Sequence, residues 1–167
     1  MKLVISEAEI DAALERVAAE INGDGKPVTF VVILKGAVCL IADLIRKLTI
    51  PFELTFITAS SYGMRGKQPG ELTIAGIEAL DLQGKEVIVV DDICDTGATL
   101  TAVCKELDTL QPQGILSLVL LHKKREPPAP FNPDRVCFDI DDLFVVGYGL
   151  DYKEQHRGLR GIYAMES

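Results

Sequence analysis

The 167-residue chain has no tryptophan, and it contains two histidines and four cysteines. The cysteines show no CxxC spacing and have no histidine nearby, which argues against a zinc site and against a disulfide framework; they are Cys39, Cys94, Cys104 and Cys137. We therefore expect a reduced protein of the cytoplasm. The sequence also lacks an apolar run of the roughly 20 residues that cross a membrane. Its first residues turn acidic too early for a signal peptide, so no membrane partner is expected.

Basic residues are also scarce. The chain has 17 Lys and Arg against 25 Asp and Glu, a formal net charge of −8. Because non-specific binding to nucleic acid depends on a basic surface, we expect no nucleic-acid partner. Two familiar phosphate-binding patterns are absent, since no GxxxxGK[ST] occurs and no GxGxxG follows a predicted strand. Internal repeats and low-complexity tracts are missing as well.

The alternation of apolar strands with amphipathic helices predicts an α/β fold. Ser6 and Glu9 have the spacing of a capping box and predict a helix that ends near Gly23 and Gly25. Apolar runs predict strands at 28–34, 52–59, 72–77, 86–91, 114–121, 136–140 and 144–146, with helices at 37–48 and 98–110. Strands that alternate with helices form a mostly parallel central sheet flanked by helices.

The stretch VIVVDDICDTGATL, residues 87–100, carries the most information about function. A buried strand ends in Asp91 and Asp92, Asp95 follows, and residues 96–99 are all small. Ligands bind at the carboxyl edge of a parallel sheet, and the N-terminus of a helix attracts a phosphate. Because three carboxylates would repel a phosphate, we expect them to face hydroxyls or a magnesium ion on the same ligand.

The stretch therefore predicts a site for a sugar phosphate that carries a metal-bound diphosphate. A simpler alternative is that Asp91 and Asp92 end a strand in solvent and that Asp95 caps the next helix.

DDICDTGATL, residues 91–100, resembles the phosphoribosyl-diphosphate signature of the type I phosphoribosyltransferases. Four more segments are similar to the hypoxanthine-guanine branch of that family: LKGA (34–37), Ser61-Tyr62, LLHKKREP (120–127) and LFVVGYGLDYKEQHR (143–157). The resemblance implies one phosphoribosyltransferase domain over residues 1–167. It also implies a flexible catalytic loop at about 60–71, a peptide bond inside the LKGA loop that can be cis, and a small hood built from the chain ends, with the base-binding segment at about 123–167.

The resemblance further implies how the ribose, phosphate and diphosphate would be held. Asp95 would be the general acid/base, and Asp91 and Asp92 would hold the ribose hydroxyls directly or through magnesium-bound water. The diphosphate would be held by Mg²⁺ and by a set of residues from three segments: Lys35, Gly36, Ser61, Tyr62 and Arg157. The amides and hydroxyls from Asp95 to Thr99 would cradle the 5-phosphate, through Asp95, Thr96, Gly97, Ala98 and Thr99. Ile93 and Cys94 are also expected to contact the substrate, with Cys94 inside the phosphate loop.

A second group would recognise the purine. Phe144 would stack on the ring, and the backbone of Val145 would contact the edge of the ring. Lys123 would donate to the 6-oxo group, although the alignment also allows Lys124. Asp151 would accept from a ring N–H or an exocyclic amine, or it would hold magnesium-bound water. We therefore expect hypoxanthine or guanine to be used and adenine to be rejected.

The implied enzyme transfers the 5-phosphoribosyl group from phosphoribosyl diphosphate to N9 of hypoxanthine or guanine, gives IMP or GMP, and releases diphosphate. The family also implies a homodimer or homotetramer. Two alternatives stay open, namely a related enzyme that prefers xanthine and a nucleotide-binding regulator on the same fold. The VVGYGLDY string argues against the first, while Asp95 and the acidic charge argue against the second.

Overall fold

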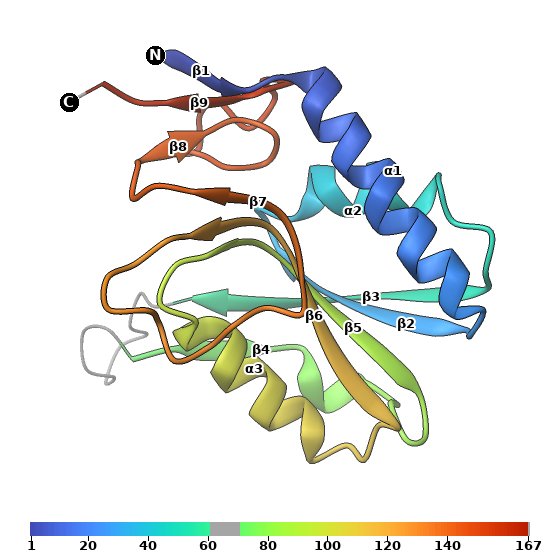
Figure 1. Ribbon diagram of the computed structural model, residues 1–167. Helices are drawn as coiled ribbons and strands as arrows, with labels where there is room; N and C mark the ends of the chain where they lie inside the picture. The colour runs from blue at the N-terminus through green and yellow to red at the C-terminus, as the bar shows by residue number, and fades with distance from the viewer. Residues whose placement is uncertain (61–70, 167) are drawn as a thin grey trace.

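A six-stranded sheet forms the centre of the molecule (Figure 1). The computed structural model describes residues 1–60 and 71–166. Every neighbouring pair of strands is parallel except β3 and β4, which confirms the predicted α/β fold with a mostly parallel sheet. The strand order is β4 (Thr73–Ala75), β3 (Phe52–Ser60), β2 (Val28–Leu34), β5 (Glu86–Cys94), β6 (Gly114–Lys123) and β7 (Arg135–Ile140).

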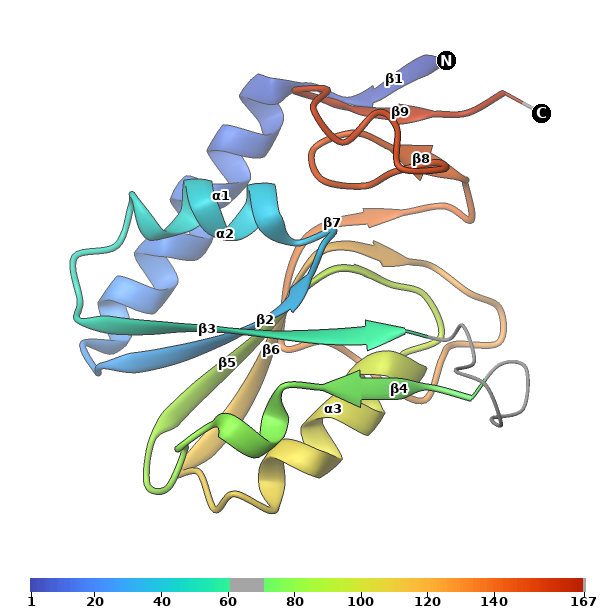
Figure 2. The same ribbon diagram turned by 180° about the vertical axis from the view of Figure 1, so that it is seen from behind.

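Helices cover both faces of this sheet (Figures 1 and 2). α1 (Glu7–Asp24) and α2 (Val38–Ile45) pack on one face, and α3 (Ala98–Asp108) packs on the other. The side chains of β2 alternate between the two apolar cores, since Phe30 joins the α1 side and Val31 joins the α3 side. A strand buried on both faces needs apolar residues at every position, which explains its continuous apolar run. Within residues 1–60 and 71–166, none of the helices is long and apolar enough to span a membrane.

The capping box predicted for the first helix is confirmed. Ser6 N donates to Glu9 Oε2 at 2.8 Å, and Glu9 N donates to Ser6 Oγ at 3.3 Å. Gly25 ends α1 with a φ of 66°, in the left-handed region where glycine carries no penalty. The predicted helix is therefore present, and both of its ends have a local cause.

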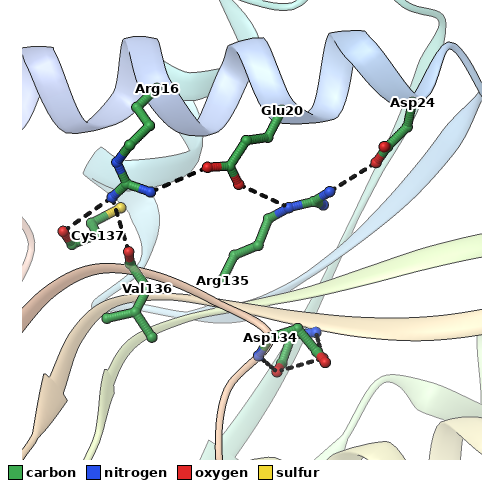
Figure 3. A network of polar contacts seen from close by, with 8 residues as sticks. Arg16, Glu20, Asp24, Asp134, Arg135, Val136 and Cys137 are labelled. Carbon is green, nitrogen blue, oxygen red and sulfur yellow. Dashed lines mark hydrogen bonds and ion pairs between the residues drawn. The ribbon is translucent and has the colours of Figure 1, made fainter.

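α1 also covers the outer edge of β7 (Figure 3). Arg16 Nη2 donates to the backbone oxygens of Val136 at 3.0 Å and of Cys137 at 3.3 Å. Arg135 reaches back to α1 and pairs with Asp24 at 2.8 Å. An open strand edge attracts other chains, so these contacts occupy backbone groups that would otherwise be available for pairing.

Both ends of the chain meet in a second, antiparallel sheet of three strands, ordered β1 (Lys2–Ile5), β9 (Ile162–Ala164) and β8 (Val145–Val146). Figures 1 and 2 show the two termini side by side in this sheet. We call this sheet, together with residues 147–161, the hood. Neither β1 nor β9 is predicted from the sequence, because strands of four and three residues show no usable periodicity.

Several boundaries differ from the prediction. β5 continues beyond its predicted end at residue 91, because its pairing with β6 extends to Cys94 opposite His122. The segment predicted as one strand at 72–77 shortens to β4 followed by the 3₁₀ turn η1 (Ile77–Ala79), since Gly76 turns the chain with a φ of 100°. α2 and α3 are shorter than the predicted 37–48 and 98–110.

Candidate active site

The strand order reverses direction at the carboxyl edge of the sheet, between β2 and β5. From β2 the chain passes through α2 to β3 on one side, whereas β5 pairs with the other side of β2 and continues through α3 to β6. Ligands of open α/β sheets bind where neighbouring connections diverge in this way. The loops at this point are residues 35–37 and 95–97, and both belong to the predicted phosphate-binding segments.

The loop 95–97 leads directly into α3. Gly97 has a φ of 84°, and a Cβ added there would lie 2.3 Å from the Cβ of Phe131, so only glycine fits. Thr96 Oγ1 accepts a hydrogen bond from Ala98 N at 3.3 Å. The first amides of a helix have no acceptor within the helix, so the start of α3 offers N–H donors to a phosphate next to the hydroxyls of Thr96 and Thr99.

Ile93 and Cys94 belong to β5 and not to the loop. The Cys94 side chain is buried in the core on the α3 side, and Ile93 packs against the core on the α1 side. Burial, with the nearby charges of Asp91 and Asp95, raises the pKa of Cys94 to about 11. A contact of either residue with a ligand would therefore come from its backbone.

Asp91 and Asp92 lie next to each other in the last part of β5. Asp91 Oδ1 accepts from Asp92 N at 2.9 Å, and Asp92 Oδ1 accepts from Ile93 N at 2.7 Å. Burial, and then the negative charge of Asp92, raises the pKa of Asp91 well above its usual range. Burial also raises the pKa of Asp92, although a hydrogen bond from Asp91 and the charge of Arg157 act in the opposite direction. Buried neighbouring carboxyls with perturbed pKa values are typical of functional sites.

The loop after β2 lies against this acidic pair. The Leu34–Lys35 peptide bond is cis, in agreement with the implied geometry of the loop. A Cβ on Gly36 would lie only 1.7 Å from Asp92 Oδ2, so the bare backbone is what reaches the carboxylate. The side chain of Lys35 turns toward the hood and pairs with Glu154 at 3.1 Å.

The hood completes this corner. A Cβ on Gly149 would lie 2.1 Å from the backbone oxygen of Gly36. Gly149 N donates to the Arg157 oxygen at 3.0 Å, and Arg157 Nη1 donates to the Gly149 oxygen at 2.7 Å. Arg157 Nη2 also pairs with Asp151 Oδ1 at 3.0 Å. Lys35, Gly36 and Arg157 were predicted to hold the diphosphate, and we call them the diphosphate corner; the fold brings all three together around Gly149.

The predicted purine-binding residues gather where β6 ends and the hood begins. Lys123 is the last residue of β6; its side chain is 13% exposed and its Nζ pairs with Asp142 Oδ1 at 2.9 Å, whereas Lys124 is exposed. Phe144 is half exposed and meets Tyr152 edge to face, with 5.6 Å between the ring centroids. Val145 is buried in β8, which leaves its backbone as the part able to contact a base.

Sequence reasoning missed two charged partners in this region. Arg125 contacts the carboxylate of Asp95 through Nε and Nη2, and Asp142 holds Lys123. Arg125 directly follows Lys123 and Lys124 in a short basic run, and this run was the available signal. Asp142 shows no sequence signal, because only the fold brings the β7–β8 connection next to the end of β6. Ser61 and Tyr62 lie outside the described residues.

Carboxylates at this edge of the sheet offer oxygen ligands for a metal ion. Mg²⁺ usually binds through one or two carboxylates and takes its other oxygens from water and substrate phosphates. Asp91 and Asp92 fit this requirement, whereas Asp151 is engaged by Arg157 and by Glu154 N at 2.8 Å. The described part of the chain contains no group of three or more His, Cys, Asp or Glu that could hold a metal alone. The donor set therefore suits an ion shared with a substrate.

Comparisons with known proteins point to one family. The phosphoribosyl transferase domain model matches residues 6–153. The hypoxanthine-guanine phosphoribosyltransferase of Aquifex aeolicus is 37% identical over 169 residues, covering 99% of this chain and 95% of that protein. The hypoxanthine phosphoribosyltransferase of Salmonella typhimurium is 36% identical, covering 95% of this chain and 92% of that protein.

Solved structures agree. The hypoxanthine phosphoribosyltransferase of Trypanosoma cruzi, in complex with the product IMP, matches with a TM-score of 0.88 at 33% identity and covers 99% of this chain and 94% of that chain. Sequence, fold and the arrangement of loops at the sheet edge thus lead to the same family. The chain belongs to the hypoxanthine-guanine branch of the phosphoribosyltransferases.

Proposed function

We propose that the protein transfers the 5-phosphoribosyl group from phosphoribosyl diphosphate to N9 of hypoxanthine or guanine, yielding IMP or GMP and diphosphate. One observation carries the proposal: Asp92 touches Gly36 of the diphosphate corner, while the strand that holds Asp92 leads directly into the loop at the start of α3. Donors for a diphosphate, acceptors for hydroxyls and donors for a monophosphate follow one another. That order matches the substrate from end to end.

Stabilisation of charge would supply most of the catalysis. As the bond to diphosphate stretches, positive charge builds on the ribose and negative charge on the leaving group. The carboxylates of Asp91 and Asp92 lie where the ribose hydroxyls would bind and favour the positive ring. The Arg157 guanidinium and the backbone at Gly36 favour the departing diphosphate. Such preorganised groups lower the barrier because they need no rearrangement during the reaction.

A bound Mg²⁺ would add positive charge at the diphosphate and so stabilise it as a leaving group. Asp91 and Asp92 are the residues proposed to hold the ion, with Asp151 as a further candidate through water. The raised pKa values of Asp91 and Asp92 support this assignment, because a cation beside them would relieve their mutual repulsion.

Asp95 is the proposed general acid/base. It follows the acidic pair by three residues and stands at the edge of the phosphate loop, beside the segment proposed to hold the purine. In this position its carboxylate would accept a proton from the purine ring nitrogen as N9 attacks the ribose. Positioned carboxylates of this kind typically contribute about 10²–10⁴ in rate.

Purine selection is assigned to the group around Lys123. The buried stem of Lys123 and its pairing with Asp142 fix the ammonium at the end of β6, where it would donate to a 6-oxo group. Adenine carries an amino group at this position, so the Lys123 ammonium would face another hydrogen-bond donor in place of an acceptor. Phe144 would stack on the ring beside the backbone of Val145, and Asp151 would accept from an N–H of the base.

The remaining features of the proposal follow from the family resemblance. We propose a single phosphoribosyltransferase domain over residues 1–167, with 60–71 as a catalytic loop in which Ser61 and Tyr62 contact the diphosphate. The enzyme would act in the cytoplasm as a homodimer or homotetramer. Cys39, Cys94, Cys104 and Cys137 are free thiols, which supports a reducing compartment.

A panel of bases tests the proposal. Purified protein is mixed with phosphoribosyl diphosphate, Mg²⁺ and hypoxanthine, guanine, xanthine or adenine, and released diphosphate is measured. We expect turnover with hypoxanthine or guanine, none with adenine, and loss of turnover when Mg²⁺ is chelated. Preference for xanthine would favour the related enzyme, and nucleotide binding without diphosphate release would favour a regulator.

A further inference from the structure

Tyr148 links the hood to α2 through its hydroxyl. The phenolic oxygen donates to Asp43 Oδ2 at 2.6 Å and lies 3.4 Å from the backbone oxygen of Cys39. The ring is almost fully buried in the core on the α1 side. Burial, reinforced by Asp43, raises the pKa of the Tyr148 hydroxyl, so it remains a neutral donor throughout the physiological range. A donor held against a carboxylate forms a short and strong hydrogen bond.

The two residues belong to the two segments that build the diphosphate corner. Asp43 lies on α2, the helix that begins two residues after Gly36. Tyr148 precedes Gly149, whose backbone packs on the Gly36 oxygen and exchanges hydrogen bonds with Arg157. The same segment follows β8, which carries the proposed purine contact of Val145. One hydroxyl therefore connects the elements proposed to hold the diphosphate and the base.

The partners of the Tyr148 hydroxyl, Asp43 and Cys39, are not among the residues proposed to contact a ligand. Tyr148 and Asp43 line a groove of about 990 Å³ between α1, α2 and residues 157–160. Among the described site residues, Arg157 alone lines this groove. Removing the hydroxyl thus leaves the proposed ligand contacts in place and changes only the support behind them.

We propose that the Tyr148–Asp43 hydrogen bond is a positioning contact that holds the purine-binding segment and the diphosphate corner in register with each other. The inference rests on the proposed placement of diphosphate at Gly36 and Arg157 and of the purine at Val145. With the bond in place, both subsites are preorganised; without it, both have to be ordered when a ligand binds. The loop 95–97 belongs to β5 and α3 and lies outside this connection.

The Tyr148→Phe variant tests the proposal, because it removes one oxygen and keeps the ring. Three ligands are measured: inorganic diphosphate with Mg²⁺ and ribose 5-phosphate by calorimetry, and hypoxanthine through its KM. We expect the Kd of diphosphate and the KM of hypoxanthine each to rise about fivefold or more, the low end of couplings seen between separate sites. The Kd of ribose 5-phosphate should stay within about twofold of the wild-type value, because its phosphate occupies the 95–97 loop.

A second series approaches the bond from the other partner. Asp43→Ala should reproduce the effect of Tyr148→Phe, the double variant should add nothing to either, and Asp43→Asn should recover part of the affinity because its amide oxygen still accepts. Tyr163→Phe is the matched control, since this hydroxyl on β9 has no hydrogen bond within the part of the chain that the structure describes. It should leave the affinities for all three ligands unchanged.

Two outcomes overturn the inference. In the first, Tyr148→Phe and Asp43→Ala bind diphosphate and hypoxanthine like Tyr163→Phe, and the bond then has no positioning role. In the second, ribose 5-phosphate binding falls as much as the other two, and the variants then act through general loss of structure. Arg157→Gln tests the diphosphate site itself, independently of the Tyr148–Asp43 bond. If this variant binds diphosphate as tightly as the wild type, the proposed placement of the diphosphate is wrong.

Discussion

Gly36 and Asp92 are in such close contact that a methyl group on Gly36 would lie 1.7 Å from Asp92 Oδ2 and 2.4 Å from its Cγ. The contact joins the ends of two neighbouring strands, β2 and β5. Asp92 is also held by the backbone N–H of Ile93 at 2.7 Å. A larger residue at position 36 would therefore press against a carboxylate that this hydrogen bond helps to hold in place.

The first prediction concerns Gly36→Ala. The added methyl group should displace the Asp92 carboxylate, reduce stability by about 1–3 kcal/mol and raise the KM for phosphoribosyl diphosphate. Thermal unfolding and steady-state kinetics measure the two effects. Gly23→Ala is the matched control, because a Cβ there meets nothing within 4 Å in the last turns of α1. Equal behaviour of the two variants would show that the crowding at Gly36 is relieved at no cost.

The second prediction concerns the pH dependence of stability. The folded state raises the pKa of Asp91, mainly by burial and then through the charge of Asp92. Between the unfolded pKa and this raised value, the folded protein keeps a proton that the unfolded chain has released. Stability from this group is therefore complete at low pH and is lost as the pH rises through the folded pKa.

Asp91→Asn should remove that loss, because an amide can stay uncharged and donate to Asp92. We expect a variant that is about 1–2 kcal/mol more stable near neutral pH, with an advantage that shrinks toward acid pH, and with strongly reduced transfer activity. Denaturant unfolding between pH 4 and 8 measures it. Glu78→Gln, at an exposed position of η1, should follow the wild-type curve. A constant difference across this range would contradict the prediction.

The third prediction concerns Asp95 and its partner Arg125. Asp95→Asn keeps the size of the side chain but cannot accept a proton, so kcat should fall by about 10²–10⁴ with little change in KM. Arg125→Gln leaves the carboxylate in place and removes only its counter-charge, so its loss in kcat should be much smaller. Single-turnover kinetics separates the chemical step from product release. Similar losses in both variants would mean that the ion pair, and not the carboxylate alone, is required.

The fourth prediction decides between the two lysines of the basic run. Lys123→Met should lower kcat/KM for hypoxanthine and guanine by about 10- to 100-fold, the effect of losing a charged hydrogen bond to a buried group. Lys124→Met should have almost no effect, because that side chain is exposed. The pair of variants is assayed with both bases. A larger loss in Lys124→Met would move the recognition of the 6-oxo group by one residue.

The central sheet could be predicted because its strands carry a local signal. The run at 28–34 is apolar at every position since both faces are covered, and it appears as β2 with the predicted bounds. The hood could not be predicted in the same way. β1 and β9 come from opposite ends of the chain, and only their pairing, such as Leu3 opposite Tyr163, makes them strands.

In the candidate site, too, residues close together in the sequence could be predicted and long-range contacts could not. Asp91, Asp92, Asp95 and Gly97 lie within seven residues, so their spacing alone indicates a phosphate site. Arg125 and Asp142 act on residues that lie 30 and 19 positions earlier in the chain. The contact of Tyr148 with Asp43 spans 105 positions. Such contacts carry no pattern in one sequence and become visible only in the folded chain.

The contact of Arg16 with the β7 backbone has a consequence for the resistance of the protein to aggregation. A strand from another molecule that paired along this part of β7 would have to displace the Arg16 guanidinium from the Val136 and Cys137 oxygens. α1 thus covers part of a strand edge that could otherwise pair with a strand of another molecule. Detachment of α1 would remove these hydrogen bonds and open this part of β7 to pairing with another chain.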